Sequence, residues 1–128
     1  MTEKIVEIGY KDKEVFESAF IKPWHPKLIE LASWVYSLDI EMIFTCLYEK
    51  RDYPSVHSLD ILRGFDLRSS VIRHPRIIED MTNDHWIYDP KRPSKRVCMW
   101  HNTGRGIHFH FQVHNKTQKN AYIKGNSR

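Results

Sequence analysis

The stretch "GIHFHFQVH", residues 106–114, alternates apolar and polar side chains. The apolar positions are Ile107, Phe109, Phe111 and Val113, and the polar positions are His108, His110, Gln112 and His114. Because successive side chains of a β-strand point to opposite faces, this period of two predicts a strand with one face in a core. A solvent-exposed face can use any polar residue, so the histidines on the other face indicate a candidate site.

A second stretch, "GFDLRS" at residues 64–69, predicts a short strand that carries a carboxylate. Phe65 and Leu67 share one face of this strand, and Asp66 points to the other. A carboxylate between two apolar residues needs a partner, because an unpaired buried charge is costly. That partner is either a metal ion or a nearby guanidinium, from Arg63 or Arg68.

The rest of the chain reads as helices followed by strands, with one helix between the strands. Helices are expected over residues 12–20, 24–39 and 74–81, and further strands over 42–48, 96–100 and 107–113. Pro26 suits the first position of the second helix, and Ile77, Ile78 and Met81 are expected to form the apolar face of the third. This order predicts an α+β fold, a small antiparallel sheet with helices packed on one face.

Length and composition fit one globular domain. The 128 residues are expected to divide into a domain over residues 1–114 and a basic, flexible tail over 115–128. No apolar run is long enough to span a membrane, and the first residues do not resemble a secretory signal, so synthesis in the cytoplasm is expected. Cys46 and Cys98 each lie in an apolar run and are expected to be buried, reduced thiols.

Charge is distributed unevenly along the chain. Residues 1–89 carry 11 basic and 16 acidic side chains, whereas residues 90–128 carry 9 basic side chains and no acidic one. A basic final third favours an anionic partner, such as a bacterial cell wall or a nucleic acid. A solvated basic tail without a partner is the alternative for the last residues.

These fragments resemble a known superfamily: the D-alanyl-D-alanine carboxypeptidases, the zinc-dependent phage endolysins and the Hedgehog signalling domain. That family carries a Ser-x-His-x-x-Gly-Arg-Ala-x-Asp signature and a later His-x-His on a strand. Here Ser55-Val56-His57 matches the start of the signature, Arg63-Gly64-Phe65-Asp66 matches its end, and "HFH" at 108–110 matches the later pair. The resemblance covers residues 40–114.

The resemblance implies one zinc ion per chain, held by His57, Asp66 and His110. It implies that His108 stands beside the metal and stabilises the oxyanion that develops during attack. Arg63 becomes a structural or substrate-binding residue. Zinc would then lie on the sheet face away from the helices. Such a set of three protein ligands leaves a fourth position open for water.

Two features depart from the family pattern. His57 and Asp66 are two residues further apart than in the signature. The family also has an acid shortly before its last zinc histidine, as general base, and this chain has "HNTGRG" at residues 101–106 instead. His101 is therefore the expected base, because an imidazole accepts a proton near neutral pH. Asp60 and Asp84 are the alternatives.

The expected function is a zinc metallopeptidase that cleaves peptide bonds of bacterial peptidoglycan, as a D,D- or L,D-peptidase. The lack of a secretory signal fits a phage or prophage lysis enzyme, which a separate factor releases to the cell wall. A catalytically weak metal-binding module of the same fold is the first alternative. A metal-dependent nuclease is less favoured, because magnesium sites prefer several carboxylates.

Overall fold

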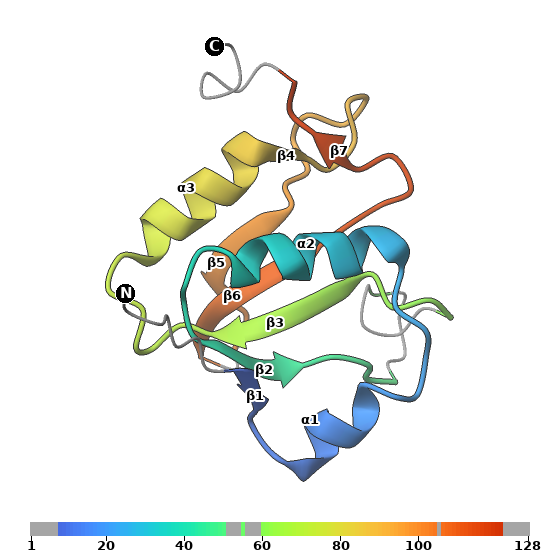
Figure 1. The fold of residues 1–128 in the computed structure, drawn as a ribbon, viewed down its shortest axis with the longest axis vertical. Coiled ribbons are helices and arrows are strands. Elements are labelled where there is room, and N and C mark those ends of the chain that lie inside the picture. Colours follow the sequence, from blue (N-terminus) through green and yellow to red (C-terminus); the bar gives the residue numbers. More distant parts are fainter. Residues whose placement is uncertain (1–7, 51–54, 56–59, 105, 122–128) are drawn as a thin grey trace, which may run out of the picture.

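The fold is α+β and centres on a five-stranded mixed sheet (Figure 1). The computed structural model describes residues 8–50, 55, 60–104 and 106–121. The strands of this sheet are β1 (Ile8–Tyr10), β2 (Met42–Cys46), β3 (Gly64–Arg68), β5 (Cys98–Asn102) and β6 (Ile107–Gln112). Their spatial order is β1-β2-β3-β6-β5, so the strand that carries the histidines lies inside the sheet.

The sheet is not purely antiparallel, which corrects the prediction from the sequence. β2, β3, β6 and β5 are antiparallel neighbours, but β1 runs parallel to β2. The chain between β1 and β2 contains two helices, α1 (Lys13–Ser18) and α2 (Pro26–Tyr36). A crossover of this length allows the second strand to run in the same direction as the first.

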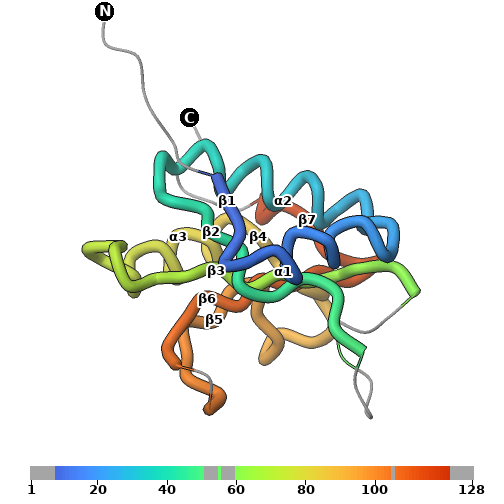
Figure 2. Tube along the Cα trace, turned by 90° about the horizontal axis from the view of Figure 1, so that it is seen from below, coloured from blue at the N-terminus to red at the C-terminus, as the bar shows by residue number. Residues whose placement is uncertain are grey.

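Helix α2 lies across one face of the sheet (Figures 1 and 2). Pro26 occupies its first turn, and the His25 side chain accepts a hydrogen bond from the Lys27 N–H. Leu28, Leu31 and Val35, which share one face of the helix at the i, i+3, i+7 spacing, are fully buried. These three side chains belong to the same core as the inward side chains of β3 and β6.

The core is largely aromatic at its centre. Phe65 of β3 stacks on Phe111 of β6 at a ring-centroid distance of 5.1 Å, and both are fully buried. Phe109 and Val113 are also fully buried, which confirms the alternation in the histidine strand. Ile107 is the exception, because it begins the strand and is half exposed.

The third helix, α3 (Pro75–His85), turns a polar face inward. Ile78 packs against the core, but Ile77 and Met81 are exposed, so the predicted apolar face is wrong at these two positions. The buried side chains on α3 are those of Glu79 and Thr82. A polar inward face is satisfactory here because α3 packs against β5, an edge strand whose backbone groups need partners.

Residues 115–121, the described part of the segment predicted as a tail, pack onto the fold. Two short strands, β4 (Trp86–Ile87) and β7 (Gln118–Lys119), form a second, antiparallel sheet. Thr117 is buried, and its carbonyl accepts a hydrogen bond from the Lys27 ammonium group. The packed structure therefore extends to at least Asn120, whose N–H donates to the His85 carbonyl.

Both cysteines are buried thiols that form no disulfide with each other, as the sequence predicted. Burial raises the pKa of the Cys98 thiol far above its ordinary value. Within the described residues, no helix is both long and apolar enough to cross a membrane.

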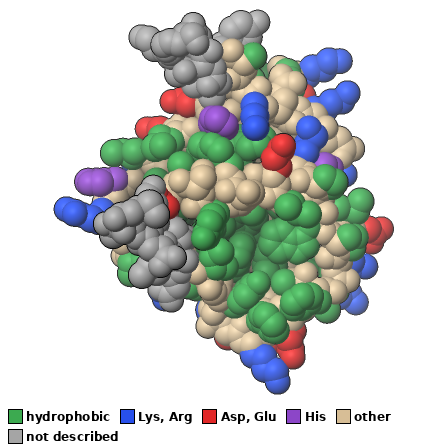
Figure 3. All heavy atoms as spheres, viewed as in Figure 1, with side chains coloured by type: hydrophobic (Ala, Val, Ile, Leu, Met, Phe, Trp, Pro, Cys, Tyr) green, Lys and Arg blue, Asp and Glu red, His purple; other side chains and the backbone are tan. Residues whose placement is uncertain are grey.

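Apolar side chains also gather on the face of the molecule seen in Figure 3, in the region of α1 and between α1 and α2. Phe16 and Phe20 are among the exposed large apolar residues of this region. Phe16 makes an edge contact with Tyr10, which in turn stacks on Phe44 of β2.

Candidate functional site

Strand pairing brings four side chains of the candidate site onto one face of the sheet. Asp66 of β3 lies opposite His110 of β6, and His101 of β5 lies opposite His108 of β6. Directly opposite residues of antiparallel strands share a face. Because the core takes Phe65, Phe109 and Phe111, these four side chains lie on the other face. They are called the histidine cluster: Asp66, His101, His108 and His110.

Asp66 is the centre of the histidine cluster. Its Oδ1 lies 2.8 Å from His110 Nδ1, and its Oδ2 lies 3.5 Å from His108 Nε2. The three side chains are only 11–14% exposed. The buried carboxylate therefore has imidazole partners from β6, whereas the Arg68 guanidinium pairs with Glu41 at 2.8 Å.

His108 is held by the turn that precedes its strand. Its Nδ1 lies 2.9 Å from the carbonyl oxygen of Gly106. Since a carbonyl can only accept, Nδ1 carries the proton and Nε2 faces Asp66. Gly106 has φ of 92°, a conformation that glycine adopts without steric cost.

His101 completes the histidine cluster from the edge strand. Its ring lies 5.2 Å from the His108 ring and 5.8 Å from the His110 ring, between centroids. Burial, together with the positive charge that His108 and His110 can carry, lowers the pKa of His101 below its usual value. A neutral His101 can accept a proton at neutral pH, as a general base must.

Gln112 is a residue of this site that the sequence reasoning missed. Its Oε1 lies 3.0 Å from His110 Nε2, and its amide nitrogen donates to the Arg96 carbonyl at 2.8 Å. Alternation along β6 was the available signal, because Gln112 follows His110 by two positions and so shares its face.

Of the expected site residues outside the histidine cluster, Arg63 is described by the structure and lies elsewhere. His57 lies outside the residues that the structure describes. Arg63 lies near His114 and is one of the charges that lower the pKa of that histidine. The Arg63 Nε atom is buried and has no hydrogen-bond partner among the described residues.

Asp60 and Asp84, the alternative general bases, contact groups outside the histidine cluster. Asp60 is fully exposed and lies 3.9 Å from the Lys22 ammonium group. Asp84 is exposed near the end of α3, where its backbone carbonyl accepts a hydrogen bond from Asn120.

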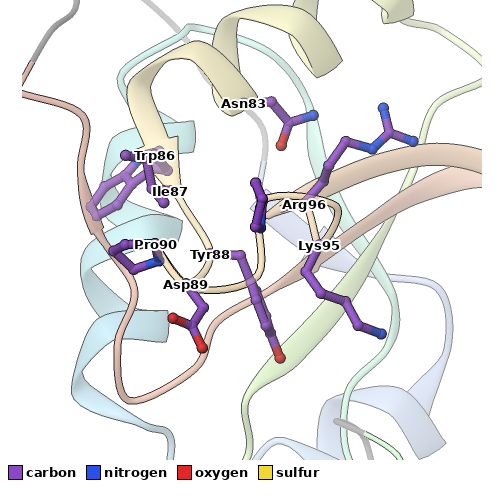
Figure 4. A pocket seen from close by; sticks show the side chains of 9 residues that line it. Asn83, Trp86, Ile87, Tyr88, Asp89, Pro90, Lys95 and Arg96 are labelled. Carbon is purple, nitrogen blue, oxygen red and sulfur yellow. The ribbon is translucent and has the colours of Figure 1, made fainter.

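A separate pocket lies beside α3 and the loop before β5 (Figure 4). Its lining residues include Trp86, Tyr88 and Arg96, and none of them belongs to the histidine cluster. Two of its charged groups are already paired. Asp89 accepts from Arg92 at 3.0 Å, and Arg96 lies 3.7 Å from Glu79.

Across the described part of the chain, no group of three or more His, Cys, Asp or Glu side chains is arranged to hold a metal ion. The donors that the histidine cluster contributes are still of the types that zinc binds, an aspartate oxygen and imidazole nitrogens.

Comparison with protein-family models, with curated proteins and with solved structures finds no match to this chain.

Proposed function

We propose that this chain is a zinc-dependent peptidase that cleaves peptide bonds of bacterial peptidoglycan, with zinc held by His57, Asp66 and His110. The observation that carries the proposal is the pairing of Asp66 with His110 across β3 and β6, with donor atoms 2.8 Å apart. The sequence resemblance assigns these same two residues to the metal. Carboxylate and imidazole are the ligands of hydrolytic zinc sites.

Each member of the histidine cluster then has a role. Zinc, when bound, polarises the scissile carbonyl and activates water. His108, whose ring the Gly106 carbonyl holds through Nδ1, stands beside the proposed metal, and the resemblance assigns it to stabilisation of the oxyanion. His101 accepts the proton of the attacking water, which its lowered pKa favours at neutral pH. The basic residues of the final third favour binding to an anionic wall.

Elemental analysis of the purified protein tests the metal assignment. We expect about one zinc ion per chain, and its loss in Asp66→Asn and in His110→Ala, because each variant weakens or removes one of only three proposed protein ligands. His74→Ala is the matched control, since His74 is exposed and its side chain makes no capping hydrogen bond on α3. Full zinc occupancy in both cluster variants would refute the assignment.

Digestion of purified cell wall tests the activity. Cleavage of peptide bonds that stops on chelation and returns with zinc supports the peptidase. Activity that needs magnesium and acts on nucleic acid would instead indicate a nuclease.

The second candidate is a catalytically weak metal-binding module of the same fold. The observation that favours it is that Asp66, the carboxylate paired with His110 and His108, is itself a proposed zinc ligand and is therefore not available as the general base. A zinc-loaded protein that cleaves no wall preparation would favour this candidate.

A further inference from the structure

We infer that an exposed basic surface, separate from the histidine cluster, binds phosphodiester groups of an anionic cell-wall polymer; the inference takes the wall as partner from the proposed function. The surface comes from β4 with the loop after it, residues 86–96, and from residues 114–119. These two segments carry 6 basic side chains and 1 acidic one, a balance of +5. The basic side chains are called the basic surface: Lys91, Arg92, Lys95, Arg96, Lys116 and Lys119.

Contacts between the two segments make this surface continuous. Trp86 pairs with Lys119 across β4 and β7, and the Lys119 ammonium group lies 5.8 Å from the centre of the Trp86 ring. Tyr88 of the first segment lies 5.7 Å from His114 of the second, between ring centroids. Residues that are distant in sequence therefore contribute their charges to one region of the molecule.

The acid of these two segments is already neutralised. Asp89 is buried, and its carboxylate accepts hydrogen bonds from the Lys91 N–H and from the Arg92 side chain, both at 3.0 Å. Four ammonium groups of the basic surface are exposed and have no carboxylate of the described residues within ion-pair distance: those of Lys91, Lys95, Lys116 and Lys119. These cations are available to an anion outside the protein.

The electrostatic surroundings of His114 agree with this surplus of positive charge. Burial and the charge of Arg92 lower the pKa of His114 below its usual value. Arg63 and Lys116 act in the same direction, and together these effects outweigh the opposing charge of Asp89.

The basic surface is also concave where it meets β4. A pocket of about 450 Å³ opens there, and Lys95 and Arg96 are among the residues that line it (Figure 4). A concavity with an excess of one charge concentrates ions of the opposite charge. The surface therefore suits an anionic ligand.

The aromatic residues of this region favour a wall polymer over a single-stranded nucleic acid. Proteins that bind single strands present aromatic faces on which bases stack. Here Trp86 is only 2% exposed, and Arg92 and His114 lie beside the Tyr88 ring. The available groups are lysine ammonium ions, which bind phosphate as point charges. A polymer of polyols joined by phosphodiesters supplies such charges without bases.

The test measures binding to purified walls of a Gram-positive bacterium by co-sedimentation, with a chelator present so that neither zinc nor cleavage contributes. One variant combines Lys91→Gln, Lys95→Gln and Lys116→Gln. We expect its Kd for the wall to be about 3–100-fold higher, since three contacts with the strength of exposed ion pairs are lost. Added salt should weaken binding of the wild type, because salt screens exposed charges.

The matched control makes the same change in net charge elsewhere, by combining Lys11→Gln, Lys13→Gln and Lys50→Gln. These three lysines are exposed, and Lys11 and Lys13 lie at α1, at the opposite end of the molecule from β7 (Figure 1). The control should bind walls as the wild type does. Equal weakening in both triple variants would show that net charge alone matters, and would overturn the assignment to the basic surface.

Two further arms identify the ligand. Walls from which hydrofluoric acid has removed the phosphodiester-linked polymers should bind less protein than intact walls, and equal binding would overturn the phosphate assignment. Tighter binding to DNA than to intact walls, lost in the Lys91, Lys95 and Lys116 variant, would assign the surface to nucleic acid and overturn the wall as partner.

The outcomes separate this inference from the proposed function. Wall binding that depends on the three lysines, in a protein that cleaves no peptide bond, supports the basic surface and refutes the peptidase. Cleavage by the wild type, together with undiminished wall binding in the Lys91, Lys95 and Lys116 variant, supports the peptidase and refutes the role of the basic surface.

Discussion

At the scale of single residues, Asp66 shows why this face of the sheet is unusual. A carboxylate that is 13% exposed would be expensive to bury without partners. His110 and His108 supply those partners from the neighbouring strand. A surface ion pair with Arg68 would have left the carboxylate with an ordinary structural role, and the structure gives Arg68 to Glu41 instead.

His101 offers a test of catalysis at the same scale. If His101 accepts the proton during attack, His101→Ala should lower turnover of wall peptides by roughly 10²–10⁴-fold, the usual contribution of a general base. Zinc content should remain at the wild-type level, because His101 is not a proposed ligand. Turnover and zinc are measured on the same samples, and unchanged turnover would direct attention to Asp60 and Asp84.

At the scale of elements, α3 stabilises the edge of the sheet through polar side chains. Glu79 accepts the Trp100 N–H at 2.8 Å, and Asn83 bonds the Cys98 carbonyl and two backbone N–H groups of the segment that leads into β5. An edge strand exposes such groups to solvent or to other chains. The polar side chains of α3 therefore make hydrogen bonds to β5 of the kind that a neighbouring strand would make, which explains why the inward face of α3 is polar.

Stability against pH tests this arrangement. Burial alone would raise the pKa of Glu79, but the Trp100 N–H and the charges of Arg76 and Arg96 outweigh burial and lower the pKa below its usual value of 4.5. A lowered pKa means that the stabilisation is complete above pH 4.5 and is lost as the pH falls through the folded-state pKa. Glu79→Gln should lower the free energy of unfolding by about 1–2 kcal/mol at neutral pH, since one partner, Arg76, is exposed and screened.

The difference between Glu79→Gln and the wild type should shrink in acid, where Glu79 itself becomes protonated. Denaturant unfolding at neutral pH and at several acidic pH values measures it. Glu17→Gln is the control, because Glu17 is exposed and pairs only weakly with Lys13, at 3.9 Å. Its effect should stay below about 0.5 kcal/mol. An equal loss in both variants would contradict the role of Glu79.

At the scale of the whole molecule, the aromatic core joins the two halves of the chain. Phe65 contacts Phe44, Trp24 and Phe111, which come from three separate segments. The histidine cluster lies on the opposite face of the same strands, so the geometry of the site depends on this core.

Removal of the central ring tests that dependence. Phe65→Ala should lower the free energy of unfolding by about 3–5 kcal/mol, because it removes buried surface and leaves a cavity. Phe20→Ala should change it by only about 0.5 kcal/mol, since Phe20 is 73% exposed. Thermal or denaturant unfolding of the two variants gives the comparison, and similar losses would mean that Phe65 is not central to the core.

Much of the fold could be predicted from local pattern. Alternation in "IHFHFQV" predicted both the strand and its buried face, and Pro26 begins a helix as its position indicated. These features depend on residues close in sequence, whose spacing determines which side chains share a face. Alternation in residues 107–113 placed His108 and His110 away from the core, and alternation in residues 64–69 did the same for Asp66.

Other features depended on contacts between distant segments, which spacing does not encode. The parallel pairing of β1, the polar inward face of α3 and the position of Arg63 near His114 are of this kind. Gln112 is the clearest example in the candidate site, because its amide donates a hydrogen bond to a carbonyl 16 residues away. The sequence by itself determined which side chains each strand presents. Only the tertiary structure decided which side chains of other strands they contact, because these contacts follow from the order and register of the strands in the sheet.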